Sequence, residues 1–413
     1  MSEIRDINCA EEGEQKIKWV QKHMPVLSAL HRQFEHERPF EGLRVSVSIH
    51  LEAKTAYLCR VLQAGGAQMA VTGSNPLSTK DDIAAALAAG GMEVYAWHAA
   101  TEEEYNRHIS MALEHKPHLV LDDGADLSEA LHTRDVDKLA HVIGASEETT
   151  TGLMRLRARD KAGTLCYPVI AVNDADAKHL FDNRYGTGQS VWDGIMRTTN
   201  LLIAGKTVVV SGYGWCGKGV AMRAKGLGAH VVITETDPIR ALEAVMDGFG
   251  VMTMDEAVLQ GDIYVTVTGC SGVIAPRHFA MMKDGAILTN AGHFNVEIDA
   301  EQLKALADRY YVARNNIMAY EIGEKTLYLI AEGRLVNLAA GDGHPAEIMD
   351  LSFAIQALSL KYLVQMRGKL ESKVYGVPKE FSAQAAHLKL EAMGISIDKL
   401  TDAQLEYMYG AKS

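Results

Sequence analysis

Short runs of β-branched and aliphatic residues alternate along the chain with longer stretches whose apolar residues recur at helical spacing. Strand-like runs fall at 43–50, 67–73, 93–98, 118–124, 141–146 and 167–174. Most of these runs are separated by helical stretches, such as 54–66 and 80–91, which end in paired glycines suited to helix C-caps. This alternation predicts a parallel sheet with helices on both faces.

A second series of the same kind begins near residue 205. Its strand-like runs are 206–214, 230–237, 262–269 and 286–292, and 326–338 suggests a further strand pair. From about residue 345 apolar positions recur at helical spacing, and 376–413 reads as a helical tail that docks on other parts of the protein. The sequence therefore predicts an α/β fold with two doubly wound, Rossmann-like parallel sheets and a helical C-terminal tail. The Gly-rich polar segment 183–194 between the two series is a candidate hinge.

Composition narrows the class of partner. The 413 residues exceed what one core usually organises, which favours two domains. A net charge of −12 argues against nucleic acid or an anionic membrane as the main partner, and suits a soluble cytosolic protein. The polar N-terminal residues and the absence of a long apolar run suggest a cytoplasmic protein. The five cysteines form no C-x-x-C pair, so we expect neither a metal site nor disulfides.

A glycine-rich turn carries the most specific chemistry. In TVVVSGYGWCGKG, the glycines Gly212, Gly214 and Gly217 fit G-x-G-x-x-G between a strand and a helix. Such a turn lets a pyrophosphate approach the backbone at a helix N-terminus. Glu235 follows 18 residues after Gly217 at the end of the next strand, where an acid binds a ribose 2′-hydroxyl and favours NAD over NADP.

Two other interpretations of this turn are a purely structural glycine turn and a Walker A loop. The spacing G-x-x-x-x-G-K is present, but Gly219 follows Lys218 where a Walker A loop needs a hydroxyl for magnesium. We therefore favour the dinucleotide-binding turn.

Polar residues also follow four strands of the first series. They are His50, Asp122 with Asp123, Glu147 with Glu148, and Asn173 with Asp174. Carboxyl ends of parallel strands share one edge, so these residues predict a polar cleft that faces the NAD domain. For any single aspartate, a helix N-cap is the more common role. Lys178, Asp182 and Asn183 follow, and a lysine near carboxylates can move a hydroxyl proton.

At this point the chain resembles the S-adenosyl-L-homocysteine hydrolase family over almost its whole length. The matching motifs are SEETTTG (146–152), NDADAKHLFDNRYG (173–186), GYGWCGKG (212–219), ITETDP (233–238), NAGHFNVEID (290–299) and LVNLAAGDGHP (335–345). The resemblance implies that NAD acts as a catalyst that is not consumed. It oxidises the 3′-hydroxyl of the nucleoside, which acidifies the C4′–H. Homocysteine is then eliminated, water adds, and the ketone is reduced back.

The resemblance also assigns residues. The catalytic group would be His50, Asp123, Glu148, Lys178 and Asp182, with Lys178 helping to deprotonate the 3′-hydroxyl. Asp123 and His50 would handle protons at C4′, C5′ and sulfur, while Glu148 and Asp182 would hold the ribose hydroxyls. Substrate contacts would further include Glu52, Lys54, His278, His293 and His344, with His278 and Phe279 gating the channel. NAD would contact Thr149, Thr150, Thr151, Asn183, Gly212, Gly214, Gly217, Glu235, Asn290 and Asn337.

Domain limits follow from the same resemblance. Residues 1–183 and 344–375 would form a discontinuous substrate-binding domain, 184–343 the NAD-binding domain, and 376–413 a tail for dimerisation or docking. The family further implies a homo-oligomer, a dimer or a tetramer.

Three features depart from the family pattern. Many members carry a cysteine in the hinge turn, where this chain has Thr187, so a thiol at that point is not required or this chain does without it. Many members end in a longer tail with a lysine and a tyrosine that reach a neighbouring subunit's NAD. Here the sequence reads EYMYGAKS, so we expect the cofactor to be held less tightly or to exchange more readily, with Tyr407 or Tyr409 as a partial substitute. Finally, the acid or amide that commonly reads adenine is replaced by Lys54, two residues after Glu52.

Because of Lys54, the sequence does not decide whether the purine base of the substrate is adenine or hypoxanthine. Lys54 only donates hydrogen bonds, which suits the O6 acceptor of hypoxanthine, and Glu52 could accept from its N1–H. The same pair could serve adenine, with Glu52 on the amino group and Lys54 on N1, or the two side chains could simply pair with each other. The first expectation is S-adenosyl-L-homocysteine, with S-inosyl-L-homocysteine as the alternative. A non-enzymatic NAD-binding homologue and an ordinary NAD-dependent dehydrogenase are the rivals from other classes.

Overall fold

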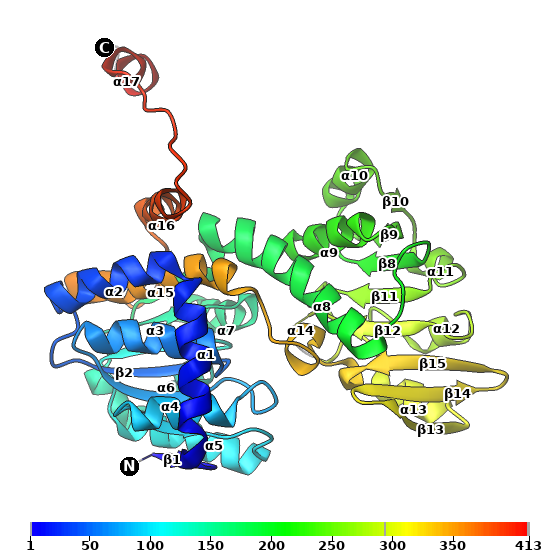
Figure 1. Ribbon diagram of the computed structural model, residues 1–413, viewed down its shortest axis with the longest axis horizontal. Helices are drawn as coiled ribbons and strands as arrows, with labels where there is room; N and C mark the ends of the chain where they lie inside the picture. The colour runs from blue at the N-terminus through cyan, green and yellow to red at the C-terminus, as the bar shows by residue number, and fades with distance from the viewer. Residues whose placement is uncertain (1, 293–294, 411–413) are drawn as a thin grey trace.

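The computed structural model describes residues 2–292 and 295–410, which form two α/β lobes and a projecting C-terminal segment (Figure 1). Each lobe is built on its own eight-stranded sheet. No helix in these described ranges is both long and apolar enough to cross a membrane.

The first sheet is parallel throughout and has the strand order β1-β4-β3-β2-β5-β6-β7-β16. Its strands are β1 (Glu3–Ile4), β2 (Arg44–Ile49), β3 (Gln68–Gly73), β4 (Glu93–Ala96), β5 (Leu119–Asp122), β6 (Gly144–Glu147), β7 (Val169–Ala171) and β16 (Val374–Gly376). The strand order reverses between β2 and β5, and such a switch point opens a crevice at the carboxyl ends of the two strands.

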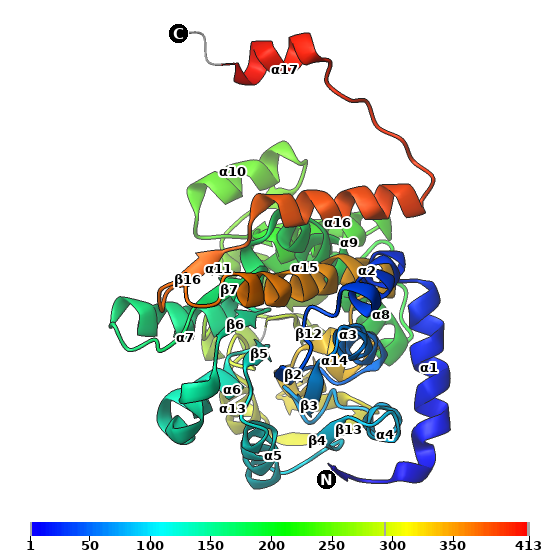
Figure 2. The same ribbon diagram turned by 90° about the vertical axis from the view of Figure 1, so that its left-hand side faces the viewer.

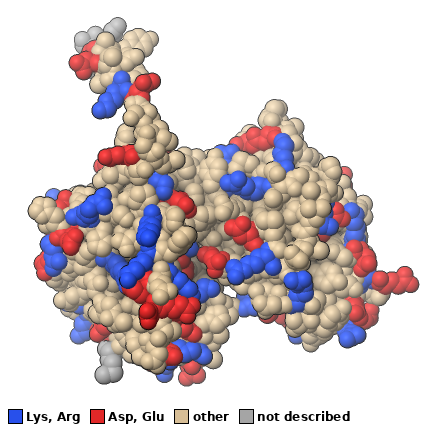
Figure 3. Space-filling view, in the orientation of Figure 1, with Lys and Arg blue, Asp and Glu red and all other residues tan. Residues whose placement is uncertain are grey.

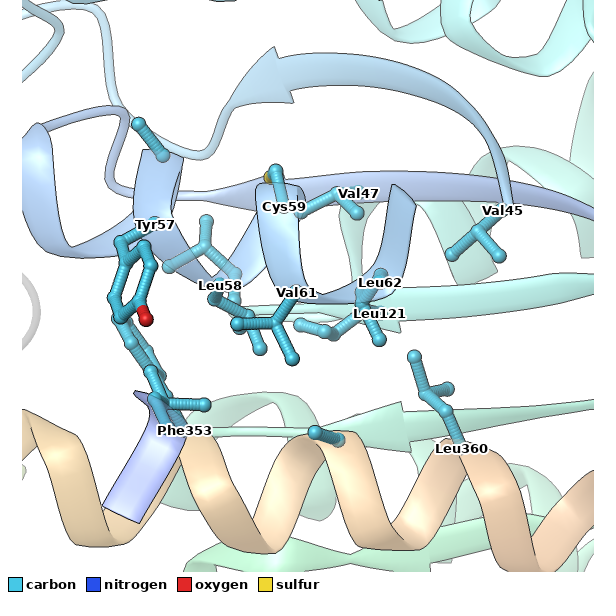
Figure 4. Packing of buried hydrophobic residues seen from close by; sticks show 14 of the residues in the cluster. Val45, Val47, Tyr57, Leu58, Cys59, Val61, Leu62, Leu121, Phe353 and Leu360 are labelled. Carbon is cyan, nitrogen blue, oxygen red and sulfur yellow. The ribbon is translucent and has the colours of Figure 1, made fainter. Parts of the chain in front are cut away.

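Helices cover both faces of this sheet, as the alternating pattern predicts. One face packs against α1 (Ala10–Lys22), α2 (Pro25–Glu37), α3 (Ala53–Ala64), α4 (Asp81–Ala89) and α15 (Ala346–Gln365). The other packs against α5 (Glu102–Glu114), α6 (Asp126–Thr133) and α7 (Thr150–Lys161). Figure 4 shows Phe353 and Leu360 of α15 facing Tyr57, Leu58 and Val61 of α3 in the first core. A helix from the C-terminal third thus completes the N-terminal lobe.

The second sheet has the order β10-β9-β8-β11-β12-β15-β14-β13. Its strands are β8 (Thr207–Ser211), β9 (His230–Thr234), β10 (Gly250–Val251), β11 (Ile263–Thr266), β12 (Ile287–Asn290), β13 (Arg309–Arg314), β14 (Ile317–Ile322) and β15 (Lys325–Ile330). It is flanked by α8 (Thr187–Thr199), α9 (Trp215–Gly226), α10 (Pro238–Met246), α11 (Met254–Ala257), α12 (Pro276–Phe279) and α13 (Ala300–Leu306). The two-lobed α/β architecture confirms the predicted fold class.

Two local expectations need correction. The run 326–338 is not a strand pair, because β15 ends at Ile330 and residues 336–339 form the short helix α14 (Val336–Ala339). The antiparallel partner of β15 is instead β14, which lies N-terminal to it, and β13 pairs antiparallel with β14. On its other side β15 pairs parallel with β12. In the first lobe, residues 136–141 form a 3₁₀ turn, so the strand expected at 141–146 begins only at Gly144.

The segment between the lobes is helical rather than an open loop. Residues Lys178–Gly186 form a π-helix that continues directly into α8. π-Helical turns are rare and frequently occur at functional sites. The hinge role of 183–194 and the domain limits stay predictions.

The C-terminal segment carries α16 (Lys379–Ala392) and α17 (Asp402–Tyr409). Figures 1 and 2 both show α17 standing away from the two lobes at the end of an extended stretch.

Candidate functional site

A cavity of about 150 Å³ lies at the β2/β5 switch point and is shared by both lobes. From the first lobe it is lined by residues that follow β2, β5 and β6, and from the interlobe segment by Lys178 and Asp182. From the second lobe it is lined by α14 and the loop that leads to His344. All five predicted catalytic residues, His50, Asp123, Glu148, Lys178 and Asp182, meet there.

Lys178 is the centre of the charged cluster. Its Nζ lies 2.8 Å from Asp182 Oδ2 and 3.3 Å from Glu148 Oε1, and donates to Asn183 Oδ1 at 3.2 Å. Burial acts to lower the pKa of Lys178, but Asp182 and Glu148 outweigh it and raise that pKa. Asp182 is fully buried, yet Lys178 and His344 hold its pKa well below the ordinary value. The pair is therefore an ammonium and a carboxylate.

Glu148 behaves differently from Asp182. Burial raises its pKa to about 7, although Lys178 acts to lower it. Gln356 of α15 donates from Nε2 to Glu148 Oε2 at 2.5 Å, and Ser352, one helical turn earlier, donates to Asp182 Oδ2 at 2.7 Å. A carboxyl group that titrates near neutrality can both take up and release a proton.

Gln356 and Ser352 were not predicted as site residues. They are fully buried polar side chains four residues apart in α15, which also buries Asp350 and Ser359. That spacing places both on one helix face, and it is the sequence signal that could have found them.

His50 and Asp123 form the second pair in the cavity. His50 Nε2 lies 3.5 Å from Asp123 Oδ2, and His50 Nδ1 lies 2.6 Å from Ser78 Oγ. Ser74 donates to Asp123 Oδ2 at 3.0 Å, and Asp123 Oδ1 is buried with no hydrogen-bond partner among the described residues. Asp123 therefore keeps one oxygen available to accept a proton from a ligand.

Other polar residues at the strand ends do not reach the cavity. Asp122 accepts from the N–H groups of Leu127 and Ser128 in the first turn of α6, although the N-cap residue of that helix is Ala125 and not Asp122. Asp174 pairs with Arg157. Neither Asn173 nor Asp174 lines the cavity, so the expectation that all four strand ends converge is corrected.

Glu147 binds the backbone of two loops that carry site residues. Its Oε1 accepts from Gly124 N–H at 2.9 Å and from Thr149 N–H at 2.8 Å. These two backbone groups directly follow Asp123 and Glu148, so Glu147 fixes the loops that carry both.

Glu52 and Lys54, the two candidate residues for purine recognition, both line the cavity. Lys54 Nζ is 2.9 Å from Glu52 Oε2 and donates to the carbonyl of Asp342 at 3.0 Å. Glu52 also caps α3 by accepting from Lys54 N–H at 3.0 Å. The pair therefore presents an ammonium donor and a carboxylate acceptor side by side.

The glycine turn has the geometry that a dinucleotide requires. Gly212 adopts φ +103°, which favours glycine, and a Cβ on Gly217 would lie 2.0 Å from the Gly212 carbonyl oxygen. At Gly214, the N-cap of α9, an added Cβ would meet nothing closer than 3.9 Å. That open space in front of a helix N-terminus fits a pyrophosphate.

In the sequence, Gly219 serves only as evidence against a Walker A loop. The structure gives it a packing reason, because its Cβ would lie 1.7 Å from the carbonyl oxygen of Arg184. Helix α9 thus packs directly on the interlobe backbone.

Glu235 lies beside the turn at the end of β9. Its oxygens accept from Tyr213 N–H at 2.7 Å, Thr236 N–H at 2.7 Å and Asp237 N–H at 3.1 Å. Burial acts to raise the pKa of Glu235, but these backbone donors outweigh it and lower that pKa. An ionised acid here suits a ribose diol and repels a 2′-phosphate.

Of the other predicted NAD contacts, some line the cavity and others do not. Asn337 and Thr149 line the cavity, and Asn337 Oδ1 is buried with no hydrogen-bond partner in the described ranges. Thr149 caps α7, which begins with Thr150 and Thr151. Asn290 bonds to Gly292, Gly333 and Thr266, so it holds the end of β12 together. Together with the glycine turn, the cavity-lining residues fit NAD.

The three predicted histidine contacts have different outcomes. His344 lines the cavity, and its Nδ1 lies 2.5 Å from Asp182 Oδ1. His278 does not belong to the site, because it is buried in α12, where its ring accepts from Ala275 N–H and lies 3.0 Å from Asp255. Phe279 is buried in the second core, and neither residue of this pair lines the cavity. His293 lies outside the described residues.

In the part of the chain that the structure describes, no cluster of three His, Cys, Asp or Glu side chains could hold a metal ion. Basic and acidic side chains are interspersed over the face of the molecule seen in Figure 3.

Comparison with known proteins agrees with this geometry. Residues 1–143 match the family described as S-adenosyl-L-homocysteine hydrolase, and residues 183–343 match the NAD binding domain of that family. An S-inosyl-L-homocysteine hydrolase of Methanocaldococcus jannaschii is 57% identical over 99% of this chain and 98% of its own length. An adenosylhomocysteinase of Thermococcus kodakarensis is 54% identical over 98% of this chain and 96% of its own length.

Among solved structures, a dipicolinate synthase polypeptide from Bacillus halodurans has a similar fold. The TM-score is 0.50 at 13% identity, over 79% of this chain and 99% of that chain. At this identity the similarity concerns the fold alone.

Proposed function

Because the chain belongs to the S-adenosyl-L-homocysteine hydrolase family, we propose that it hydrolyses the thioether of an S-nucleosyl-L-homocysteine to a nucleoside and L-homocysteine. The observation that carries the proposal is the convergence of Lys178, Asp182 and Glu148 with His50 and Asp123 in one cavity beside a dinucleotide turn. The NAD-binding domain makes NAD the cofactor. We place its pyrophosphate at Gly214, its ribose diol at Glu235 and its reactive end toward Asn337 and Thr149.

Bound NAD supplies a hydride acceptor that oxidises a ribose hydroxyl and later returns the hydride. The protein's own part is proton movement. Lys178 is held as an ammonium by Asp182 and Glu148, so on its own it can donate to the 3′-oxygen but cannot remove its proton. We assign Glu148 as the proton's destination, reached through Lys178, because it lies 3.3 Å away and titrates near neutrality. Asp182 keeps Lys178 charged and oriented.

Asp123 and His50 serve the second proton transfer. Asp123 Oδ1 has its accepting capacity available, and His50 lies beside Asp123 Oδ2. A carboxylate in this position accepts the C4′ proton once the neighbouring carbon is a ketone, and the adjacent imidazole delivers a proton to the departing sulfur. Microscopic reversal of these transfers then adds water at C5′.

Two nucleosides are candidates, and the relatives carry both names at similar identity. Family membership favours the adenosyl compound as the first candidate. The Lys54–Glu52 pair favours the inosyl compound as the second, because a lysine ammonium bonds more strongly to a lactam carbonyl than to a ring nitrogen. Glu52 would accept from the relatively acidic N1–H of hypoxanthine, and both bonds would be charge-assisted.

The deciding experiment incubates the purified holoenzyme with S-adenosyl- and S-inosyl-L-homocysteine separately and measures thiol release. We expect homocysteine from at least one compound, without net formation of reduced cofactor. Absence of thiol release from both would overturn the proposed function. Steady accumulation of reduced cofactor would instead identify an ordinary dehydrogenase.

We further propose a cytoplasmic homo-oligomer, in which the projecting segment with α17 packs on another copy. Its apolar residues support this, because Leu405, Met408 and Tyr409 are exposed in the single chain. Sedimentation equilibrium of the full chain tests it, and a monomer at micromolar concentration would contradict it.

A further inference from the structure

Behind the cavity, three side chains connect the NAD-binding turn to the charged cluster. Cys216 Sγ of α9 lies 3.5 Å from Thr187 Oγ1, the first residue of α8. Thr187 Oγ1 lies 3.2 Å from His344 Nε2, and His344 Nδ1 lies 2.5 Å from Asp182 Oδ1. Asp182 in turn holds Lys178. Neither Thr187 nor Cys216 lines the cavity, so neither side chain is placed to touch the substrate there.

Glycines make this contact chain possible. A Cβ on Gly188 would lie 2.7 Å from the backbone of Gly219, so α8 and α9 approach more closely than side chains allow. A Cβ on Gly186 would lie 2.9 Å from His344 Nδ1, so the imidazole lies directly on the interlobe backbone. The close approach of three backbone segments therefore places Cys216, Thr187 and His344 in line.

The donor and acceptor roles of Cys216, Thr187 and His344 are fixed by the charge of Asp182. The 2.5 Å contact between His344 Nδ1 and Asp182 Oδ1 is an ion-pair contact, and Asp182 Oδ1 has no hydrogen bond of ordinary geometry among the described residues. A carboxylate oxygen this close repels a ring-nitrogen lone pair, so the proton of a neutral His344 ring sits on Nδ1. His344 Nε2 is then an acceptor, and the hydroxyl of Thr187 donates to it. The oxygen of Thr187 can accept in turn, and the thiol of Cys216 donates to that oxygen. Every member has a matching partner in this arrangement.

We propose that Thr187 and Cys216 are positioning residues that fix the tautomer and orientation of His344 and thereby the Asp182–Lys178 pair. The thiol of Cys216 reaches the hydroxyl of Thr187 from the NAD-binding turn. The inference rests on the proposed function for its kinetic consequence, but the tautomer of His344 can be measured without any reaction.

The test compares Thr187→Val, which keeps the branched shape but removes the hydroxyl, with Thr187→Ser, which keeps the hydroxyl. Thr199→Val is the matched control, because Thr199 is a buried threonine of the same helix whose hydroxyl donates to Ile195 within the helix. We expect Thr187→Val to lower kcat about five- to ten-fold, the effect of losing one hydrogen bond, with little change in KM. Thr187→Ser should restore most of the rate, and Thr199→Val should keep it.

A second readout needs no substrate. ¹⁵N NMR of the histidine-labelled holoenzyme near pH 8, with His344 assigned by a His344→Gln variant, reports which ring nitrogen carries the proton. We expect the Nδ1–H form in the wild type and a mixture of tautomers in Thr187→Val. Cys216→Ala should have a smaller effect that does not add to that of Thr187→Val.

Two results would overturn the inference. One is a wild-type His344 spectrum that shows the Nε2–H form, or a Thr187→Val spectrum that is unchanged. The other is a Thr187→Ser enzyme as slow as Thr187→Val, which would assign the effect to packing of the methyl group. If the wild type releases no homocysteine but the NMR result is as expected, the proposed function fails and the positioning chain stands.

Discussion

Lys178 Nζ lies 2.8 Å from Asp182 Oδ2, and these two side chains come from a single turn of the π-helix between the lobes. Both are buried, and each holds the other in its charged form. The geometry concentrates a proton-transfer group at the point where the chain passes from the first lobe to the second. Lys178 and Asp182 thus lie on the π-helix that connects the two lobes.

Replacing Lys178 by Met should remove the group that contacts the 3′-oxygen. We expect homocysteine release to fall at least about 100-fold, because positioned acid–base groups contribute that much or more. Lys361→Met is the control, since Lys361 pairs with Glu37 outside the cavity. Bound NAD, measured after denaturation of each variant, should remain near the wild-type content. A Lys178→Met enzyme with more than a tenth of the wild-type rate would contradict the assignment.

The pKa of Glu148 predicts a specific pH dependence of stability. Folding raises this pKa from its ordinary 4.5 to about 7, so the folded state favours the protonated form. The contribution of protonated Glu148 to the free energy of unfolding is fully present below pH 4.5 and is lost as the pH rises through 7. Glu148→Gln stays uncharged at every pH. The free energy of unfolding of Glu148→Gln minus that of the wild type should therefore be about 2 kcal/mol larger at pH 8 than at pH 5.

Equilibrium urea unfolding of both proteins at the two pH values measures this gain. Glu103→Gln on the exposed face of α5 is the control and should show no such trend. A constant difference between wild type and Glu148→Gln would show that the carboxyl group is not protonated on burial.

Gly214→Ala tests the NAD site with little disturbance of the protein. The added methyl group meets no atom closer than 3.9 Å, so the melting temperature of the NAD-free protein should not change. The methyl group would occupy the space assigned to the pyrophosphate, and NAD affinity should fall at least about 100-fold. Gly226→Ala in the same helix also has open space and should bind NAD normally. Equal NAD affinity in the two variants would place the pyrophosphate elsewhere.

Lys54→Met tests how the purine is recognised. If Lys54 donates to a carbonyl at position 6, its loss should lower kcat/KM for the inosyl compound about ten-fold more than for the adenosyl compound. The ratio of the two kcat/KM values on one enzyme preparation is the measurement. An unchanged ratio would mean that Lys54 serves only its contacts with Glu52 and Asp342.

Local patterns predicted the fold and most of the cavity because they reflect local physics. The strand–helix alternation and the glycine turn are set by residues close together in the chain. Side chains that approach from a distant segment have no such local signal, which is why Ser352 and Gln356 were missed. The helix at 336–339 was read as a strand because its apolar run is too short for periodicity to distinguish the two.

His278 was expected at the site, but it does not line the cavity. A histidine followed by a phenylalanine matched a functional pattern, but the ring bonds to the backbone at the start of its own helix. Gly219 shows what only the three-dimensional structure explains, since the carbonyl that excludes a side chain there belongs to Arg184, far away in sequence.

The most direct test of the account follows absorbance of the reduced nicotinamide band after rapid mixing of holoenzyme with S-adenosyl- or S-inosyl-L-homocysteine. With at least one of them we expect a rise within the first turnover that stays below one equivalent per active site and returns toward baseline as homocysteine appears and substrate is exhausted. Homocysteine release with no transient reduction at any time would contradict it, as would reduced cofactor that accumulates and never returns.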